Sequence, residues 1–487
     1  MTDTDDDTDV QDYRLCTDCI GEAFLKAQIE KNGQDGTCNY CGEAGKTTSI
    51  GEMADEIETA FEHHYRRTPT EPSSLEYTMM KEGDCQWERE GEPVVYAIGE
   101  AAEIDEEPAE DIRRVLEERH WDMEAAQVGE EGPFDEEAHY TAKEVDDIEY
   151  RENWRYFENS LKTEARFFSS ASEATLDGIF EELTGHSDPD GNPVIVEVGP
   201  KTKIVSLYRA RVFQSVAELE EALKRPDLHI GPPPAALARA GRMNAHGISV
   251  FYGATDANVA IGEVRPPVGS RVVVGRFTLL RKVKLLDVTA LRSVYVEGSV
   301  FDPAYIRRLE RAKFLERLSE RITRPVMPDD EPLEYLITQV IADYLAGRAD
   351  PELDGILYPS VQDGTGGSNV MLFHKSSRVA LMDIPDGTMI DTDSAHQTED
   401  GWETDYRVWE EPLPSGPEEP AKNSDFGPDF AAILTYSVLM THDYDPREGT
   451  LELDLAVLKV HHVQAATYTT VPHSVRRHRS ANLRRSN

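Results

Sequence analysis

Three residue types that could act together on a dinucleotide occur in chain order in this sequence. Arg209 follows Leu207-Tyr208, and a guanidinium offers a planar, permanently charged fork to phosphate or ribose oxygens. Tyr252 ends an apolar run, so its ring could stack on nicotinamide or adenine while its hydroxyl keeps a partner. Glu263 stands among apolar residues, where a carboxylate needs a partner or a chemical task. Such a set suits cleavage of a glycosidic bond, because the carboxylate can offset positive charge developing at the ribose.

Each of these residues also has a purely structural interpretation. Arg209 could be a surface arginine on a strand, and Tyr252 could be a core tyrosine. The stretch 256–264 predicts a short helix, capped by Thr255 or Asp256 and ended by Pro266, with Glu263 in its last turn and partly buried. An ion pair between Glu263 and Arg242 or Arg265 would then suffice to explain the carboxylate.

Taken with Gly241-Arg242-Met243-Asn244, these residues resemble the RES family, which is named for its arginine, glutamate and serine. The resemblance spans about 195–380. It implies a fold similar to that of the ADP-ribosyltransferases. It also implies the activity of the family's toxins, which destroy NAD and pair with an antitoxin protein. It also implies that Arg209, rather than Arg211 two residues further on the same strand face, is the first family arginine.

The resemblance also implies further substrate-binding residues. Arg242 and Asn244 are expected to shape the pocket and to bind phosphate. The family serine corresponds either to Ser360, in Tyr-Pro-Ser, or to Thr338, in Leu-Ile-Thr-Gln. Asn369, in Gly-Gly-Ser-Asn, could line the same site.

Three activities remain open from the sequence. The leading expectation is an enzyme that cleaves the nicotinamide–ribose bond of NAD and transfers the ADP-ribose to water or phosphate. A second is an ADP-ribosyltransferase acting on a macromolecule. A third is a non-catalytic sensor or scaffold that binds an NAD-derived ligand. The long segment before the RES-like part could replace an antitoxin as an internal brake or sense a signal.

Four cysteines form two pairs near the start of the chain, in the pattern Cys-x2-Cys-x18-Cys-x2-Cys. Two thiolates on each of two tight turns can complete a tetrahedral shell around zinc. The pattern therefore predicts a structural zinc ion, because four protein ligands leave no open coordination position. A redox dithiol is the alternative. The predicted ligands are Cys16, Cys19, Cys38 and Cys41.

The layout of paired cysteines followed by helices resembles the HEPN-related domain that precedes some RES domains. Arg113-Arg114 followed by His120 has the spacing of HEPN ribonucleases, although a solvated helix face explains this spacing as well. The acidic surroundings disfavour RNA as a substrate.

The formal net charge of the 487-residue chain is −43 at pH 7. Such a surface repels nucleic acid and anionic membranes, so the site must supply its own positive charge to hold anionic NAD. We find no apolar run long enough to span a membrane and no basic-then-apolar leader, which favours a cytoplasmic protein.

The fold expected from these patterns is α+β, with a zinc-bound helical domain followed by a mixed α/β RES domain. The expected parts are an acidic leader with the cysteine module (1–45), an acidic helical, HEPN-like domain (46–190), the RES domain (191–390) and a loop-rich extension with a late strand and a basic tail (391–487). Strands are predicted at 194–198, 204–208, 248–252, 272–277, 355–360, 370–373 and 455–463, and amphipathic helices at 306–322 and 333–345.

Overall fold

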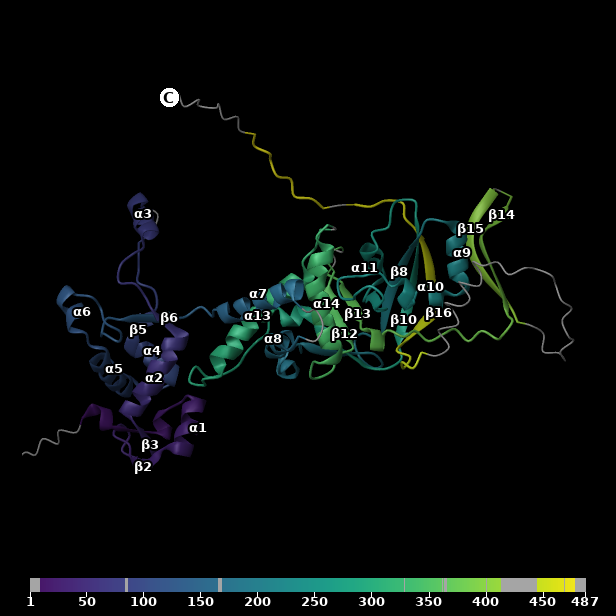
Figure 1. Cartoon of the computed structure of the whole chain (residues 1–487). Coiled ribbons are helices and arrows are strands. Elements are labelled where there is room, and N and C mark those ends of the chain that lie inside the picture. Colours follow the sequence, from purple (N-terminus) through teal and green to yellow (C-terminus); the bar gives the residue numbers. More distant parts are fainter. Residues whose placement is uncertain are drawn as a thin grey trace, which may run out of the picture. The chain divides into compact units, whose positions relative to one another are not determined.

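The computed structural model describes residues 9–83, 86–164, 169–327, 329–360, 362, 366–399, 401–412, 445–467 and 469–477. The chain divides into two compact units (Figure 1): unit 1 comprises Met1–Val194 and Ala290–Ile322, and unit 2 comprises Ile195–Thr289 and Thr323–Asn487. The start of the acidic leader, most of the proline-rich stretch 412–420 and most of the basic tail lie outside the described residues.

Unit 1 begins with a small three-stranded sheet that holds the cysteine pairs. Its strands are β1 (Arg14–Cys16), β3 (Ala44–Ser49) and β2 (Gln34–Thr37), in that order across an antiparallel sheet. The short helices η1 (Val10–Asp12) and η2 (Thr17–Cys19) flank β1, and α1 (Ala23–Asn32) connects η2 to β2.

Helix α2 (Ile50–His64) follows the sheet, and a complete capping box in its first turn fixes where the helix begins. The Ser49 hydroxyl accepts a hydrogen bond from the Glu52 backbone N–H at 3.1 Å, and the Glu52 carboxylate accepts one from the Ser49 N–H at 2.9 Å. One face of α2 is buried; its members are Ile50, Met53, Ile57 and Phe61.

The rest of the first segment of unit 1 mixes helices with a second small sheet. The helices are α3 (Ser74–Glu82), α4 (Val94–Ala102), α5 (Glu106–His120) and α6 (Met123–Val128). The sheet has the order β4 (Tyr65–Arg67), β6 (His139–Ala142), β5 (Glu92–Pro93). Unit 1 is therefore not purely helical, because two three-stranded sheets lie within it, a feature that the helical prediction missed.

Three further helices complete unit 1: α7 (Ile148–Thr163), α8 (Ser170–Phe180) and α13 (Tyr305–Thr323), whose last residue belongs to unit 2, together with the turn η3 (Leu183–Gly185). The apolar face of α7 is buried at Trp154, Phe157 and Leu161. Ion pairs fix α13 to this unit, including one between Arg321 and Glu158 at 2.6 Å.

Unit 2 is built on one eight-stranded sheet with the order β16-β10-β8-β9-β13-β12-β11-β7. Neighbouring strands are antiparallel except for β11 and β12, which are parallel. Their bounds are β7 (Ile195–Val198), β8 (Ser206–Phe213), β9 (Phe251–Ala254), β10 (Arg271–Leu279), β11 (Val283–Asp287), β12 (Gly355–Pro359), β13 (Ser368–Leu372) and β16 (Leu451–His462).

Alternate residues of the strands point to opposite faces of this sheet, and each face packs into a core of its own. Leu207 of β8 and Phe277 of β10 belong to one core, together with Leu219 of α9 (Val216–Lys224). Ala210 and Val272 belong to a second core, together with Val259 of α11 (Ala257–Glu263). The remaining helical elements of unit 2 are α10 (Pro226–His229), α12 (Val288–Leu291, shared with unit 1), α14 (Glu331–Gly347), η4 (Ala235–Leu237) and η5 (His374–Ser376).

The mixed sheet confirms the mixed α/β class expected for the C-terminal part, and β16 rejoins this sheet as predicted for the late strand. The expectation of a loop-rich chain from residue 391 onwards is wrong for most of residues 391–411. There β14 (Met389–Thr398) and β15 (Gly401–Glu411) form an antiparallel hairpin. We missed this hairpin because its side chains are mostly exposed, so no apolar stripe marks it.

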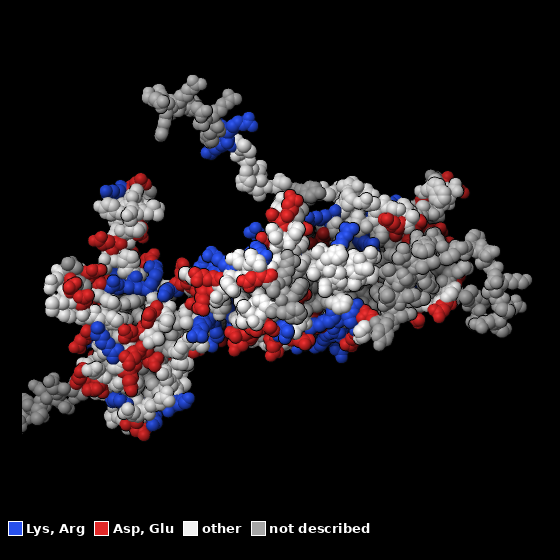
Figure 2. All heavy atoms as spheres, in the orientation of Figure 1, with Lys and Arg blue, Asp and Glu red and all other residues white. Residues whose placement is uncertain are grey.

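The face drawn in Figure 2 carries interspersed acidic and basic side chains. Across the described residues, every helix is too short or too polar to cross a bilayer.

Candidate active site

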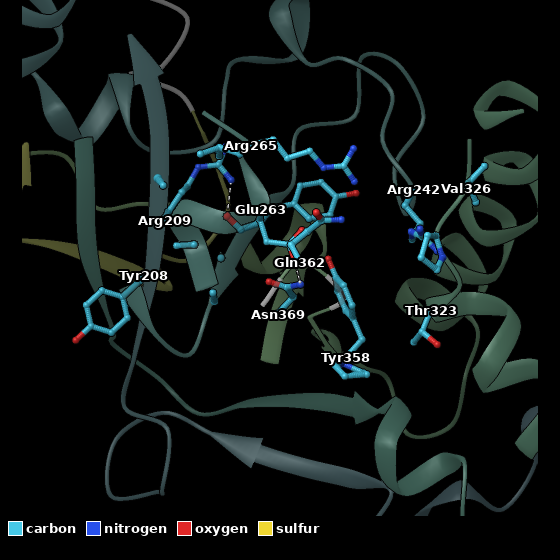
Figure 3. A pocket seen from close by; sticks show the side chains of 18 of the residues that line it. Tyr208, Arg209, Arg242, Glu263, Arg265, Thr323, Val326, Tyr358, Gln362 and Asn369 are labelled. Carbon is cyan, nitrogen blue, oxygen red and sulfur yellow. Dashed lines mark hydrogen bonds between the residues drawn. The ribbon is translucent and has the colours of Figure 1, made fainter. Parts of the chain in front are cut away.

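A cavity of about 350 Å³ opens in unit 2, where β8, β9, β12 and β13 meet α11 and the start of α14. Its walls include Arg209, Arg242, Arg265, Glu263 and Asn369. Figure 3 shows these side chains lining the pocket, with Glu263 among them. Its volume falls within the range of small-molecule sites in proteins.

Glu263 is the last residue of α11 and projects its carboxylate at the cavity wall. Asp256 caps the helix, since its carboxylate accepts a hydrogen bond from the Asn258 N–H at 2.7 Å. The Ser360 hydroxyl donates to Glu263 Oε1 at 2.6 Å, and the Asn369 amide donates to the same oxygen at 2.7 Å. Two neutral donors therefore orient the carboxylate and leave its negative charge in place.

The expectation that Glu263 is partly buried is wrong, because its side chain is exposed. Apolar neighbours in sequence suggested burial, and Val259 and Ala260 of the same helix are indeed in the core. Glu263, however, ends the helix at the cavity wall, where its side chain remains exposed. The exposed carboxylate can therefore contact a ligand in the cavity without having paid the free-energy cost of complete removal from water on folding.

Arg209 bridges two strands that separate next to the cavity. Strands β8 and β9 share a single paired position, Tyr208 with Ala254. Arg209 Nη1 donates to the Tyr252 carbonyl at 2.6 Å, and its Nε donates to the Ile230 carbonyl at 2.8 Å. Burial lowers the pKa of Arg209 to about 10, so the guanidinium remains charged at neutral pH. Arg209 lines the cavity, whereas Arg211 donates to the His229 carbonyl and stacks on Phe213.

Arg242 projects into the cavity from the turn Gly241–Asn244. Its Nη1 donates to the Arg324 carbonyl at 2.9 Å, and its guanidinium carbon lies 5.8 Å from the centre of the Tyr335 ring. Gly241 is required in this turn, because a Cβ there would lie 2.7 Å from the Asn244 Oδ1 atom.

Tyr252 and Asn244 support this turn from within the protein. The Tyr252 hydroxyl donates to Asn244 Oδ1 at 2.9 Å and accepts from the Met243 N–H at 3.1 Å. The Asn244 amide donates to the carbonyls of Arg239 and Ile248, both at 3.0 Å. Asn244 is buried, and it is absent from the residues that line the cavity. Burial raises the pKa of Tyr252 to about 12, so its hydroxyl stays protonated.

Helix α14 holds the same turn from the other side. The buried Thr338 hydroxyl donates to the Arg242 carbonyl, and the Gln339 amide donates to the carbonyls of Gly241 and Asn244 at 2.9 and 3.0 Å. Of the two candidates for the family serine, Ser360 contacts Glu263, whereas Thr338 supports the backbone of Arg242.

Several cavity residues escaped sequence reasoning. Tyr335 lies in the predicted amphipathic stretch of α14, Tyr358 stands in the same Tyr-Pro-Ser motif as Ser360, and Gln362 follows shortly after. Arg265 was considered only as an ion-pair partner of Glu263. Sequence order gave no sign that these four residues would meet, because they come from α14, from the end of β12 and just after it, and from the segment after α11, which only the fold brings together.

The cavity provides the local positive charge that an anionic ligand needs. Three arginines line it, against two carboxylates, those of Glu263 and Glu331. The local balance thus opposes the net charge of −43 of the whole chain.

In unit 1, the four predicted zinc ligands lie together. Their sulfur atoms are within 4.8 Å of one another, with Cys16–Cys41, Cys16–Cys19 and Cys19–Cys38 separations of 3.5, 3.6 and 3.8 Å. A tetrahedral ion with bonds of about 2.3 Å would separate its sulfur ligands by about 3.8 Å. Both the geometry and the thiolate chemistry fit a closed zinc site.

Both arginines considered for an HEPN-type site make contacts within α5, and Arg114 donates to Glu110 at 3.0 Å. Arg113 is buried and donates to Glu110, Glu117 and the Phe134 carbonyl. His120 Nε2 lies 2.8 Å from Glu58 Oε1.

In a comparison with known protein families, residues 207–397 match the model of the RES domain. The matched stretch contains Arg209, the turn with Arg242, Glu263, Ser360 and Asn369. This match supports the RES family for the part of the chain that builds the cavity, and it covers none of the cysteine module or the helices of the first 194 residues. No curated protein matches the chain.

Proposed function

We propose that the RES domain of this chain consumes NAD by cleaving the bond between nicotinamide and ribose. The observation that carries this proposal is the Glu263 carboxylate, oriented by Ser360 and Asn369 at the wall of an arginine-lined cavity. RES domains are generally associated with NAD-related toxin activity, and the mixed α/β architecture is compatible with a fold resembling the ADP-ribosyltransferases.

The reaction needs no strong nucleophile in its first step. The bond from ribose C1′ to the nicotinamide nitrogen breaks, and its electron pair leaves with neutral nicotinamide. The ribose then carries oxocarbenium-like positive charge, which the Glu263 carboxylate stabilises electrostatically. Because Ser360 and Asn369 both bond to Oε1, we assign Oε2 the contact with the ribose. Water or phosphate then attacks C1′ and loses a proton to solvent.

The remaining residues named from the sequence receive distinct roles. Arg209 and Arg242 offer positive charge to the phosphates, and Tyr252 presents its ring to the cavity. Asn244 and Thr338 act through the turn that carries Arg242, so they are positioning residues. Ser360 is the better candidate for the family serine, because it bonds directly to Glu263.

The test is product analysis with purified full-length protein, NAD and either buffer alone or added phosphate. We expect free nicotinamide together with ADP-ribose or its 1″-phosphate, resolved by mass. Glu263→Gln should abolish both products. Glu197→Gln, which removes an exposed carboxylate paired with Lys282 elsewhere in unit 2, should leave them unchanged. Equal NAD loss in wild type and Glu263→Gln would refute the assigned role of Glu263.

Two other functions remain distinguishable in the same experiment. An ADP-ribosyltransferase would release nicotinamide only when a macromolecular acceptor is added, and the acceptor would gain the mass of ADP-ribose. A sensor or scaffold would bind NAD without releasing nicotinamide. The three cavity arginines are compatible with binding alone, whereas the oriented Glu263 favours chemistry.

We further propose that the four cysteines bind a structural zinc ion, that the protein is the toxin of a toxin–antitoxin or defence system with an antitoxin partner, and that it works in the reducing cytoplasm. Sulfur separations of 3.5–3.8 Å support the zinc site. We propose no ribonuclease activity, because Arg113 and Arg114 both bond to Glu110 within α5 and His120 contacts Glu58.

A further inference from the structure

One of the cavity arginines has an unfavourable backbone conformation. Arg265 has a φ of +43°, in the left-handed region, two residues after the end of α11. Glycine is the usual residue at such a helix end because it has no Cβ. The following residue, Pro266, restricts the backbone of Arg265 further. An arginine here costs folding free energy that a glycine would avoid.

A left-handed backbone does not by itself indicate a binding residue. Five non-glycine residues of the described chain have positive φ, and Lys201 is another cation among them, with a φ of +64°. Lys201 is exposed in a loop of unit 2. Of the five, Arg265 is the one that lines the cavity of about 350 Å³.

The surroundings of Arg265 show what its side chain faces. Arg265 is exposed and lines the cavity, and the half-buried Arg242 lines the same cavity from the turn Gly241–Asn244. Both guanidinium groups lower the pKa of the Tyr335 hydroxyl electrostatically, although burial raises it overall. The two cations therefore act on one region of the cavity wall. They reach it from different elements, and a planar guanidinium matches phosphate oxygens.

We propose that Arg265, together with Arg242, forms the subsite for a pyrophosphate group, and that its strained backbone is retained for this contact. The proposal rests on the proposed function only in its choice of ligand class, a nucleoside diphosphate such as the ADP-ribose half of NAD. Glu263 lies two residues before Arg265, so the same helix end presents a carboxylate for the ribose and a cation for the phosphates.

The variant Arg265→Gly separates strain from binding because the two effects have opposite signs. We expect it to bind ADP-ribose about tenfold more weakly, the loss typical of one charge-assisted hydrogen bond. Its thermal unfolding midpoint should stay equal to that of wild type or rise, because the left-handed strain is relieved. Arg265→Lys keeps the charge but loses the planar fork, so its affinity should lie between those of wild type and Arg265→Gly.

Lys201→Gly is the matched control, because it also removes a cation from left-handed backbone but lies outside the cavity. It should leave the affinity for ADP-ribose unchanged. Inorganic pyrophosphate should compete with ADP-ribose in wild type and lose about tenfold in potency in Arg265→Gly. Adenosine, which has no phosphate, should bind both proteins equally.

Two results would overturn the proposal. One is unchanged affinity of Arg265→Gly for ADP-ribose and pyrophosphate. The other is a lower unfolding midpoint with an equal loss of adenosine binding, which would indicate a structural role. Failure of the proposed function looks different: wild type would release no nicotinamide from NAD, while the Arg265-dependent binding of pyrophosphate would persist.

Discussion

At the scale of single residues, the proposed site depends on two hydrogen bonds to one oxygen. Ser360 and Asn369 both donate to Glu263 Oε1, at 2.6 and 2.7 Å. Because both bonds go to Oε1, the other carboxylate oxygen, Oε2, is left for the substrate. They also fix the rotation of a side chain that would otherwise be free at an exposed helix end.

Ser360→Ala should therefore lower kcat by about tenfold to a hundredfold with little change in KM, because it misorients Glu263 without removing its charge. Steady-state kinetics of nicotinamide release would measure this split. Ser360→Thr keeps the hydroxyl and should recover most of the rate. An increase in KM with unchanged kcat in Ser360→Ala would contradict the assigned role.

Single residues also show how much of the site could be predicted from the sequence. The order Arg209, Tyr252, Glu263 was readable, and the structure brings all three to one cavity. The hydroxyl of Tyr252, in contrast, bonds inward to Asn244 and Met243, which no spacing rule could reveal. Exposure of Glu263 was also hidden, because it depends on where α11 ends relative to the cavity.

At the scale of elements, the turn Gly241–Asn244 links the core to the cavity. It accepts hydrogen bonds from Tyr252 of β9 and from Thr338 and Gln339 of α14. Arg242 is thus presented by a turn that two separate elements hold in place.

Gln339→Ala should loosen this turn, because it removes both amide donors at once. We expect KM for NAD to rise severalfold while kcat falls less, since Arg242 contributes to binding. Arg242→Ala should raise KM by at least as much, and the double variant should add little to it. Full additivity of the two effects would show that Gln339 does not act through Arg242.

The stability of the segment just before β16 should depend on pH. The Arg447 guanidinium lowers the pKa of Asp445 to about 2, and Arg378 bonds to the Asp445 carbonyl at 2.8 Å, just before β16. Because the folded pKa is below the ordinary value of 3.8, the ion pair stabilises the folded state above about pH 4. This stabilisation is lost as the pH falls through about 2.

Asp445→Asn should accordingly be less stable than wild type at pH 7. The difference in denaturant midpoint should shrink as the pH falls below about 4. A constant difference from pH 7 to pH 3 would show that the carboxylate charge does not matter there.

Elements also differ in how well the sequence predicted them. Strands with apolar runs, such as β10 and β13, and the stripes of α13 and α14 were recognised because their burial follows a short period. Strand β11 was missed because it follows β10 after three residues, and the exposed hairpin β14–β15 was missed because its faces are polar. The strands β4, β5 and β6 have two to four residues and depend on pairing between distant segments.

At the scale of the whole molecule, a chain with a net charge of −43 presents a cavity lined by three arginines and two carboxylates. The cysteine module is joined to the rest of unit 1 by the Tyr40 hydroxyl, which donates to Asp111 of α5 at 2.9 Å. Tyr40 lies between Cys38 and Cys41, so the ligand loop itself contacts the helix.

Removal of zinc from the full-length protein should therefore increase hydrogen exchange in residues 14–49 and in α5. Exchange in β8, β10 and β13 of unit 2 should not change. Cys38→Ser should reproduce the effect, with loss of about one zinc equivalent. Wild-type protein that contains no zinc when purified from zinc-supplemented medium would refute the metal assignment.

The central claim is that Glu263 stabilises the ribose cation formed when nicotinamide leaves NAD. Its most direct test is the rate of nicotinamide release at saturating NAD by wild type and Glu263→Gln, side by side. The account predicts measurable release by wild type and a fall of at least about a hundredfold in the variant, with ADP-ribose still bound by both. Release at the same rate by both proteins would contradict it.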